Sequence, residues 1–427
     1  LFEEETAVTQ FDHLVFRAGY NLSWLHSESG QRTNSQYTND SFTKRTQRDM
    51  GQLSAHDRFV HLFINGLYWG LYNISERIND KFMAAYFDGD EDDFDVINHD
   101  GLSDGDMTAF NTMLDLAKNG NFDQLLSGQL LYMENYIDYM LLNFYIGNID
   151  WAHNNWYTAR SRINPGNGFY FFSWDAENSL TDVNINRISG FQGQLRSILF
   201  GSSSGSSTDK GLYNNEEFRL LFADRVHKHF FNSGSLTPEK TAELYGKLTA
   251  EIDPAIILES ARWGDYRKNT LTPRNSNPPL YTRDDHWLPR KEKLLKDYFP
   301  KRSDVVYRQL ENLGLVSEID PPAFSSFGGS TDNPIELLMS ATEGDVYYTT
   351  DGTDPRECGT GNIRASATLY NAPLQVTEAC TIKARSKDGQ IWSALSEAVF
   401  TGGSIFIRYI ITIIHYSLPS QKKEMFG

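Results

Sequence analysis

The chain has 427 residues, of which 40% are hydrophobic, and this length predicts two or more domains with their own cores. Its formal net charge is −17, which argues against nucleic acid as a partner because no basic stripe is available to neutralise phosphates. No apolar run approaches the roughly 20 residues of a spanning helix, so none is expected. Cys358 and Cys380 are compatible with either a disulfide or two free thiols.

The first part of the chain predicts a small antiparallel sheet. Residues 11–17 and 59–64 alternate between apolar and polar side chains, which is typical of strands. Asn65-Gly66 is a strong two-residue hairpin signal, and residues 68–74 provide the returning strand. A helix is expected to begin near Asp80, and an acidic cluster at 88–95 is expected to be a solvated loop.

A buried helix and two further strands follow. Residues 107–118 have the pattern of an amphipathic helix, and residues 130–146 are so strongly apolar that they predict a helix in the core. Residues 156–162 and 169–174 predict two strands joined by a Gly- and Pro-containing turn.

The next segment is largely helical. Helices are predicted at 216–231, 237–263 and 287–313, and the Gly/Ser-rich segment 201–207 predicts a loop. Strands come first and helices later, so residues 1–316 are predicted to form an α+β domain.

The C-terminal part changes character after Pro321-Pro322. Short alternating strands separated by turn residues predict a small all-β, immunoglobulin-like sandwich over residues 317–402. The segment 403–427 is apolar, ends in basic residues, and matches neither domain. No role is assigned to this tail.

Three polar residues between 147 and 180 carry the strongest functional signal. Asp150 follows the apolar helix, Asn155 comes five residues later, and Asp175 directly follows an aromatic strand. Capping does not explain Asp150, because a carboxylate at a helix C-terminus opposes the helix dipole. Phosphoryl transfer on a kinase-type scaffold needs one carboxylate for the acceptor hydroxyl, and an amide and a second carboxylate for metal ions.

Several motifs occur in the order typical of one protein family. The stretches HLFINGLYWGLYNISERIND, NIDWAHNNWY and FSWDAENS, followed by NEEFRLLFADRVHKHFF and DDHWLPRKEKLLKDYFP, resemble the spore-coat protein H (CotH) kinase family over about residues 10–315. The resemblance implies an atypical protein-kinase-like fold, a secreted or surface setting, and phosphorylation of Ser residues with ATP and Mg²⁺ or Mn²⁺.

The resemblance also implies roles for individual residues. Asp150 would be the catalytic residue that positions the acceptor hydroxyl, while Asp175, Asn155 and Glu177 would hold metal. The implied nucleotide-binding residues are Glu76, which closes the hairpin motif, and Arg77, whose guanidinium suits phosphate geometry. Arg17 suits phosphate for the same reason, and an ion-pair role remains open for both arginines.

Two departures from the family pattern bear on activity. The family places a Lys-bearing strand upstream of the region that begins this chain, so we expect an N-terminally truncated kinase fold in which the phosphate-binding lysine is missing. Leu22 also stands where relatives often carry Asp.

The C-terminal sandwich, through VYYTTDGTDP and TIKARSKDG, resembles the C-terminal domain of chitobiases and β-hexosaminidases, which implies possible contact with polysaccharide.

These observations lead to one main functional hypothesis and two alternatives. The main hypothesis is an extracellular or cell-surface kinase that phosphorylates Ser residues of extracellular or coat-type proteins. The first alternative is a non-catalytic pseudokinase scaffold in surface adhesion or in glycan or matrix binding. A glycoside hydrolase is the weaker alternative, because no acid pair can be identified from the sequence.

Overall fold

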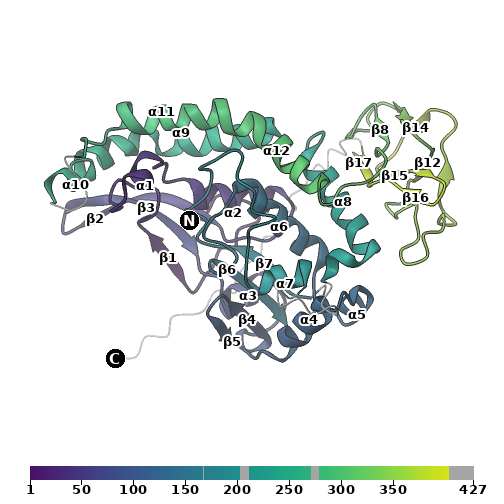
Figure 1. Cartoon of the computed structure of the whole chain (residues 1–427), viewed down its shortest axis with the longest axis horizontal. Coiled ribbons are helices and arrows are strands. Elements are labelled where there is room, and N and C mark those ends of the chain that lie inside the picture. The colour runs from purple at the N-terminus through teal and green to yellow at the C-terminus, as the bar shows by residue number, and fades with distance from the viewer. Residues whose placement is uncertain (167, 202–210, 271–277, 403–427) are drawn as a thin grey trace, which may run out of the picture.

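The computed structural model describes residues 1–166, 168–201, 211–270 and 278–402 (Figure 1). The Gly/Ser-rich segment at 201–207, apart from Gly201, and the 403–427 tail lie outside the described residues. Within the described part, the order of elements is α+β followed by all-β, as predicted. None of the described helices is both long enough and apolar enough to cross a membrane.

A three-stranded antiparallel sheet opens the fold, with strand order β1-β3-β2. Its strands are β1 (Leu14–Arg17), β2 (Asp57–Ile64) and β3 (Leu67–Glu76). Asn65 and Gly66 both have positive φ, at 51° and 78°, so the predicted two-residue hairpin is confirmed. The register places Arg17, the last residue of β1, opposite Asn73 of β3.

A second antiparallel sheet has the strand order β5-β4-β6-β7. Its strands are β4 (Phe94–Asn98), β5 (Gly101–Asp104), β6 (Trp156–Ser161) and β7 (Tyr170–Ser173). The last two were predicted, whereas β4 emerges from the end of the acidic segment that was expected to be a loop. Phe94, Val96 and Ile97 of β4 are buried, and this apolar burial stabilises the strand despite its acidic approach.

Helices surround and cover both sheets (Figure 1). The α-helices of this part are α1 (Ser29–Thr33), α2 (Asn39–Asp49), α3 (Asp80–Tyr86), α4 (Thr108–Lys118), α5 (Phe122–Ser127), α6 (Met133–Ile146), α7 (Gln194–Phe200), α8 (Glu216–Phe230), α9 (Pro238–Trp263), α10 (Tyr266–Asn269), α11 (Leu288–Lys293) and α12 (Phe299–Glu311). Short 3₁₀ turns are η1 (Glu91–Asp93) and η2 (Leu212–Asn214), and π-helical turns are η3 (Arg283–Trp287) and η4 (Leu294–Tyr298).

The helix α6 is the centre of the main core. Every residue of α6 except Glu134 is buried, which confirms the helix predicted from the apolar run. It packs against α2, α8, α12 and β7. Gly147 ends α6 with φ 64°, and a Cβ at this position would lie 2.5 Å from Ile185 Cγ2, so glycine is required here on both counts.

The C-terminal domain is the predicted small all-β unit. Its strands are β8 (Ala323–Phe324), β9 (Gly328–Ser330), β10 (Ile335–Leu337), β11 (Met339–Ser340), β12 (Asp345–Thr349), β13 (Thr368–Leu369), β14 (Leu374–Val376), β15 (Cys380–Asp388), β16 (Ile391–Trp392) and β17 (Ser396–Thr401). They enclose a separate core around Leu337 and Ile382. Cys358 and Cys380 are both free thiols. In Figure 1 this domain lies beside α8 and α12.

Candidate active site

The predicted site lies where two loops meet. The loop after α6 carries Asp150 and Asn155, and the loop after β7 carries Asp175 and Glu177. Backbone hydrogen bonds join the loops: the Ile149 N–H donates to the Asn178 carbonyl at 3.0 Å, and the Leu180 N–H donates to the Ile146 carbonyl at 2.8 Å. The two loops are therefore held as one unit rather than meeting by chance.

Asn155 connects the two acids that were predicted to act together. Its Nδ2 donates to Asp150 Oδ2 at 3.1 Å and to the Asp175 carbonyl oxygen at 3.2 Å. Asn154 Nδ2 donates to Asp150 Oδ1 at 3.1 Å, and His153 Nε2 lies 3.3 Å from the same oxygen. The side chains of Asp150 and Asp175 are 34% and 32% exposed, so both remain accessible to a substrate.

Two of these residues adopt a backbone conformation that is uncommon outside glycine. Asn155 has φ 62° and Asp175 has φ 53°, both in the left-handed region. Asn and Asp tolerate this region better than other L-residues, and such strained positions cluster at functional sites. The sequence therefore places tolerant residues at the two turns where the site needs them.

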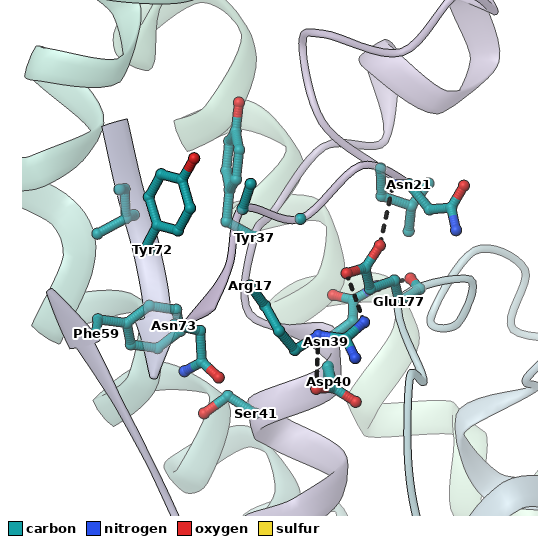
Figure 2. Close-up of a pocket in the computed structure, with 14 residues that line it drawn as sticks. Arg17, Asn21, Tyr37, Asn39, Asp40, Ser41, Phe59, Tyr72, Asn73 and Glu177 are labelled. Atoms are coloured by element: carbon teal, nitrogen blue, oxygen red, sulfur yellow. Dashed lines mark hydrogen bonds and ion pairs between the residues drawn. The ribbon is translucent and has the colours of Figure 1, made fainter. Parts of the chain in front are cut away.

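Arg17, at the end of β1, binds the acids of the second loop, of which Figure 2 shows Glu177. Its Nη2 donates to Asp175 Oδ1 and, at 3.0 Å, to Glu177 Oε1, and its Nε lies 3.7 Å from Asp40 Oδ2. Glu177 Oε2 also accepts from the Asn21 backbone N–H at 3.0 Å. Arg17 was considered as a phosphate contact or an ion-pair partner, and here it makes ion pairs with the proposed metal ligands.

The helix α2 contributes a second cation and was not predicted. Lys44 Nζ lies 2.7 Å from Asp40 Oδ2 and donates to Ser75 Oγ at 2.9 Å, and its side chain is fully buried. Asp40 Oδ1 accepts from the Ala176 N–H at 2.9 Å, which ties α2 to the loop of Asp175. Asp40 and Lys44 are four residues apart, and that spacing was the available signal for this pair.

The charges of the cluster are unevenly compensated. Burial opposes ionisation of Asp40, but Lys44 and Arg17 outweigh it and lower its pKa to about 2. Burial is the main influence on the other two acids, and it raises the pKa of Asp175 and of Glu177 despite Arg17. Three carboxylates thus share two cations, and Asp175 and Glu177 would gain most from added positive charge.

A pocket opens beside this cluster (Figure 2). Arg17, Asn39 and Glu177 line it together with residues of β2, β3 and α2. The buried Oδ1 atoms of Asn39 and Asn73 have no hydrogen-bond partner among the described residues. Unpaired buried acceptors are costly unless a ligand satisfies them, so the pocket suits a ligand that carries polar hydrogens.

Oxygen ligands suited to a magnesium or manganese ion are present. Within the described part of the chain, neither Asp175 Oδ2 nor Asn155 Oδ1 makes a hydrogen bond, which leaves a carboxylate and an amide oxygen free to bind a hard cation. The described residues contain no group of three His, Cys, Asp or Glu side chains arranged to hold a metal by themselves. Binding would therefore depend on the amide and on oxygens of the ligand, as is usual for magnesium–nucleotide sites.

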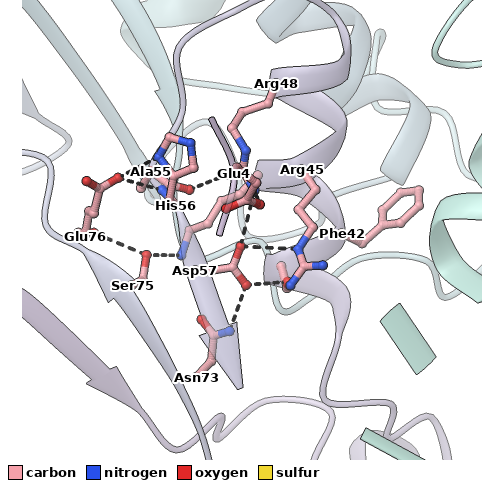
Figure 3. A network of polar contacts seen from close by, with 12 residues as sticks. Glu4, Phe42, Arg45, Arg48, Ala55, His56, Asp57, Asn73, Ser75 and Glu76 are labelled. Carbon is pink, nitrogen blue, oxygen red and sulfur yellow. Dashed lines mark hydrogen bonds and ion pairs between the residues drawn. The ribbon is translucent and has the colours of Figure 1, made fainter. Parts of the chain in front are cut away.

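Glu76 and Arg77 lie outside this cluster. Glu76 Oε2 accepts from the His56 backbone N–H at 2.7 Å, and Figure 3 shows Glu76 beside His56. Glu76 Oε1 also accepts from Tyr86 Oη at 2.8 Å. Arg77 is exposed and lines a small cavity that it shares with Asp12 and Lys81. The structure thus brings together Asp150, Asn155, Asp175 and Glu177, but it places Glu76 in a buried structural network.

Comparisons with known protein families agree with this geometry. Residues 35–304 match the family described as CotH kinase protein, and residues 335–398 match the family described as Fn3 associated, close to the domain type expected for the C-terminal part. No curated protein matches the chain. The first match covers more than half of the sequence and includes both loops of the site. The chain therefore belongs to the CotH kinase family, with a small Fn3-associated β domain after the kinase domain.

Proposed function

We propose that this protein is a secreted or surface kinase that transfers the γ-phosphate of ATP to Ser residues of extracellular or coat-type proteins. The observation that carries the proposal is the bridge by Asn155 between Asp150 and the loop of Asp175. Family membership supports kinase activity in general. The serine acceptor, the location and the protein substrate are our proposals.

The roles of the residues follow from their contacts. Asn154 and Asn155 each donate to one oxygen of Asp150, so its carboxylate is held in one orientation. In that position Asp150 would accept the proton of the serine hydroxyl as the Ser oxygen–phosphorus bond forms and the bond to ADP breaks. Asp175, Asn155 and Glu177 would hold Mg²⁺ or Mn²⁺, which supplies charge neutralisation on the phosphates.

A kinase assay with labelled ATP and a Ser-containing acceptor protein tests this function. Asp150→Asn and Asp175→Asn should each lower the transfer rate by at least about a hundredfold, because each removes a group that acts in the transition state. Asp304→Asn, at an exposed position on α12, is the matched control and should keep full activity. Equal transfer by all four proteins would rule out the proposed roles.

One observation favours the alternative of a non-catalytic scaffold. Arg17 already pairs with both Asp175 and Glu177, and a pseudokinase would keep such ion pairs permanently. Thermal unfolding with and without ATP and Mn²⁺ separates the two functions. A ligand at 100 times its Kd stabilises the folded state by about 2.7 kcal/mol, and a scaffold without a nucleotide site would show no shift in Tm.

A further inference from the structure

Arg17 pairs with two of the acids that the proposed function assigns to a metal ion. Its guanidinium contacts Asp175, Glu177 and Asp40, and it is the only cation found on the carboxylates of Asp175 and Glu177 within the described part of the chain. A divalent cation bound by the remaining oxygen of Asp175 would share this carboxylate with the guanidinium and lie close to it. Like charges at that separation repel strongly in a partly buried site, so the two cations compete for these carboxylates.

The two cations of the cluster differ in their freedom to move. Lys44 is fully buried and is fixed by Asp40 and Ser75. Arg17 keeps 14% of its side chain exposed and lines the pocket. The backbone of Arg17 is fixed because β1 pairs with β3. The charge, however, lies at the end of a long side chain that has several rotatable bonds. A change of partner therefore requires only a rotation of the Arg17 side chain.

Aromatic and cationic groups surround this guanidinium. Arg17 Cζ lies 5.4 Å from the centroid of the Trp174 ring, and Lys44 Nζ lies 5.0 Å from the same ring. Lys44 Nζ also lies 2.7 Å from Asp40 Oδ2, so this acid keeps a cation when Arg17 leaves. Arg17 lines the pocket, and a guanidinium binds phosphate oxygens in the same bidentate way as carboxylates.

We propose that Arg17 exchanges partners during nucleotide binding. In the empty protein it neutralises Asp175 and Glu177, and when a divalent cation binds these acids it moves to the phosphate groups of the nucleotide. This inference rests on the proposed function, and it assigns to Arg17 a contact with the phosphates. The exchange couples the two ligands: metal frees the arginine, and the arginine then strengthens nucleotide binding.

Binding measurements on Arg17→Gln test the exchange, because its two consequences have opposite signs. By isothermal titration, Mn²⁺ alone should bind the variant more tightly than the wild type, by on the order of tenfold, since a competing cation is gone. With Mn²⁺ saturating, ATP should bind the variant more weakly, by about tenfold, since a charged phosphate contact is lost. Arg17→Lys keeps the charge and should lie between the two proteins in both measurements.

Arg356→Gln is the matched control. Arg356 is 13% exposed and pairs with Glu217 at 2.6 Å, far along the chain from the pocket. It should leave both affinities unchanged, and the Tm of each variant reports whether it is folded. If Arg17 had only a structural role, its replacement would weaken the binding of Mn²⁺ and of ATP together. That result overturns the exchange, and so does no change in either affinity. Failure of the wild type to bind ATP with Mn²⁺ would instead overturn the proposed function and this inference with it.

Discussion

Single residues show why the acids of this site were easier to find than its cations. Asp150, Asn155 and Asp175 stand at the ends of strongly patterned elements, so their positions were visible in the sequence. Arg17 also ends a predicted strand, but it acts through partners more than 150 positions away, at Asp175 and Glu177. Sequence spacing carries no information about such a pair, because the contact exists only after β1 and the loop after β7 are brought together.

A buried glutamate on α9 gives a prediction at this scale. Glu259 is 4% exposed and accepts from the Leu71 N–H of β3, next to the pocket. Burial raises its pKa from 4.5 to about 7. Between these two pH values the folded protein holds a proton that the unfolded chain has lost, so stability falls as pH rises, and above pH 7 the full penalty of roughly 3 kcal/mol applies.

Glu259→Gln removes this titration. The difference in Tm between the variant and the wild type should grow by a few degrees from pH 5 to pH 8. The wild type becomes less stable over this range because only it must ionise a buried carboxyl. Thermal unfolding of both proteins at the two pH values measures the difference. Glu292→Gln, at an exposed position on α11, should show no such change. A constant difference between Glu259→Gln and the wild type would contradict the assignment.

At the scale of elements, the unpredicted helix α2 organises the site. Most of its polar residues are buried, which no amphipathic pattern of a surface helix would indicate. Asn39 Nδ2 donates to the carbonyls of Glu177 and Ser179, at 3.1 and 2.9 Å. Gln47 covers the edge strand β7: its Nε2 donates to the Phe171 carbonyl and its Oε1 accepts from the Ser173 N–H, both at 2.8 Å. The helix thus replaces a neighbouring strand at the edge.

Gln47→Met should therefore destabilise the kinase domain. The change keeps the size of the side chain but leaves the buried Ser173 N–H without a partner, which costs roughly 2 kcal/mol. Asp175 follows this strand, so kinase activity should fall as well. Urea unfolding followed by tryptophan fluorescence measures the loss. Gln124→Met, at an exposed position on α5, is the control, and equal stability of the two variants would show that the edge contact is unimportant.

At the scale of the whole molecule, the β domain is attached to α8 by buried ion pairs. The side chain of Arg385 on β15 is 2% exposed and binds Asp224 of α8 at 2.7 and 2.6 Å and Asp354 of its own domain at 2.8 and 2.6 Å. Asp224 Oδ1 also accepts from the Leu395 N–H at 2.8 Å. Burial raises the pKa of Asp224, so the ionised acid depends on Arg385. The two domains are therefore held as one unit.

Asp224→Asn should loosen this attachment without unfolding the β domain, because Arg385 keeps its pair with Asp354. The substitution removes one charge from a buried pair, so we expect the interface to lose roughly 2 kcal/mol of stabilising free energy. Calorimetry should then show the two domains unfolding separately, and small-angle scattering should show a larger radius of gyration. Asp304→Asn should behave as the wild type does. Unchanged unfolding and scattering for Asp224→Asn would mean that other contacts hold the domains together.

The sequence by itself determined the order of an α+β part followed by an all-β part, the hairpin and the buried helix α6, because each depends on local patterns of apolar, Gly and Asn residues. It also indicated Asp150 and Asp175 as candidate site residues, since both interrupt apolar elements. Only the tertiary structure decided the cations of the site, the role of α2, and the placement of Glu76 with His56 and Tyr86. These depend on contacts between distant segments, and a polar residue in a sequence does not reveal whether its partner is water, a backbone group or another charge.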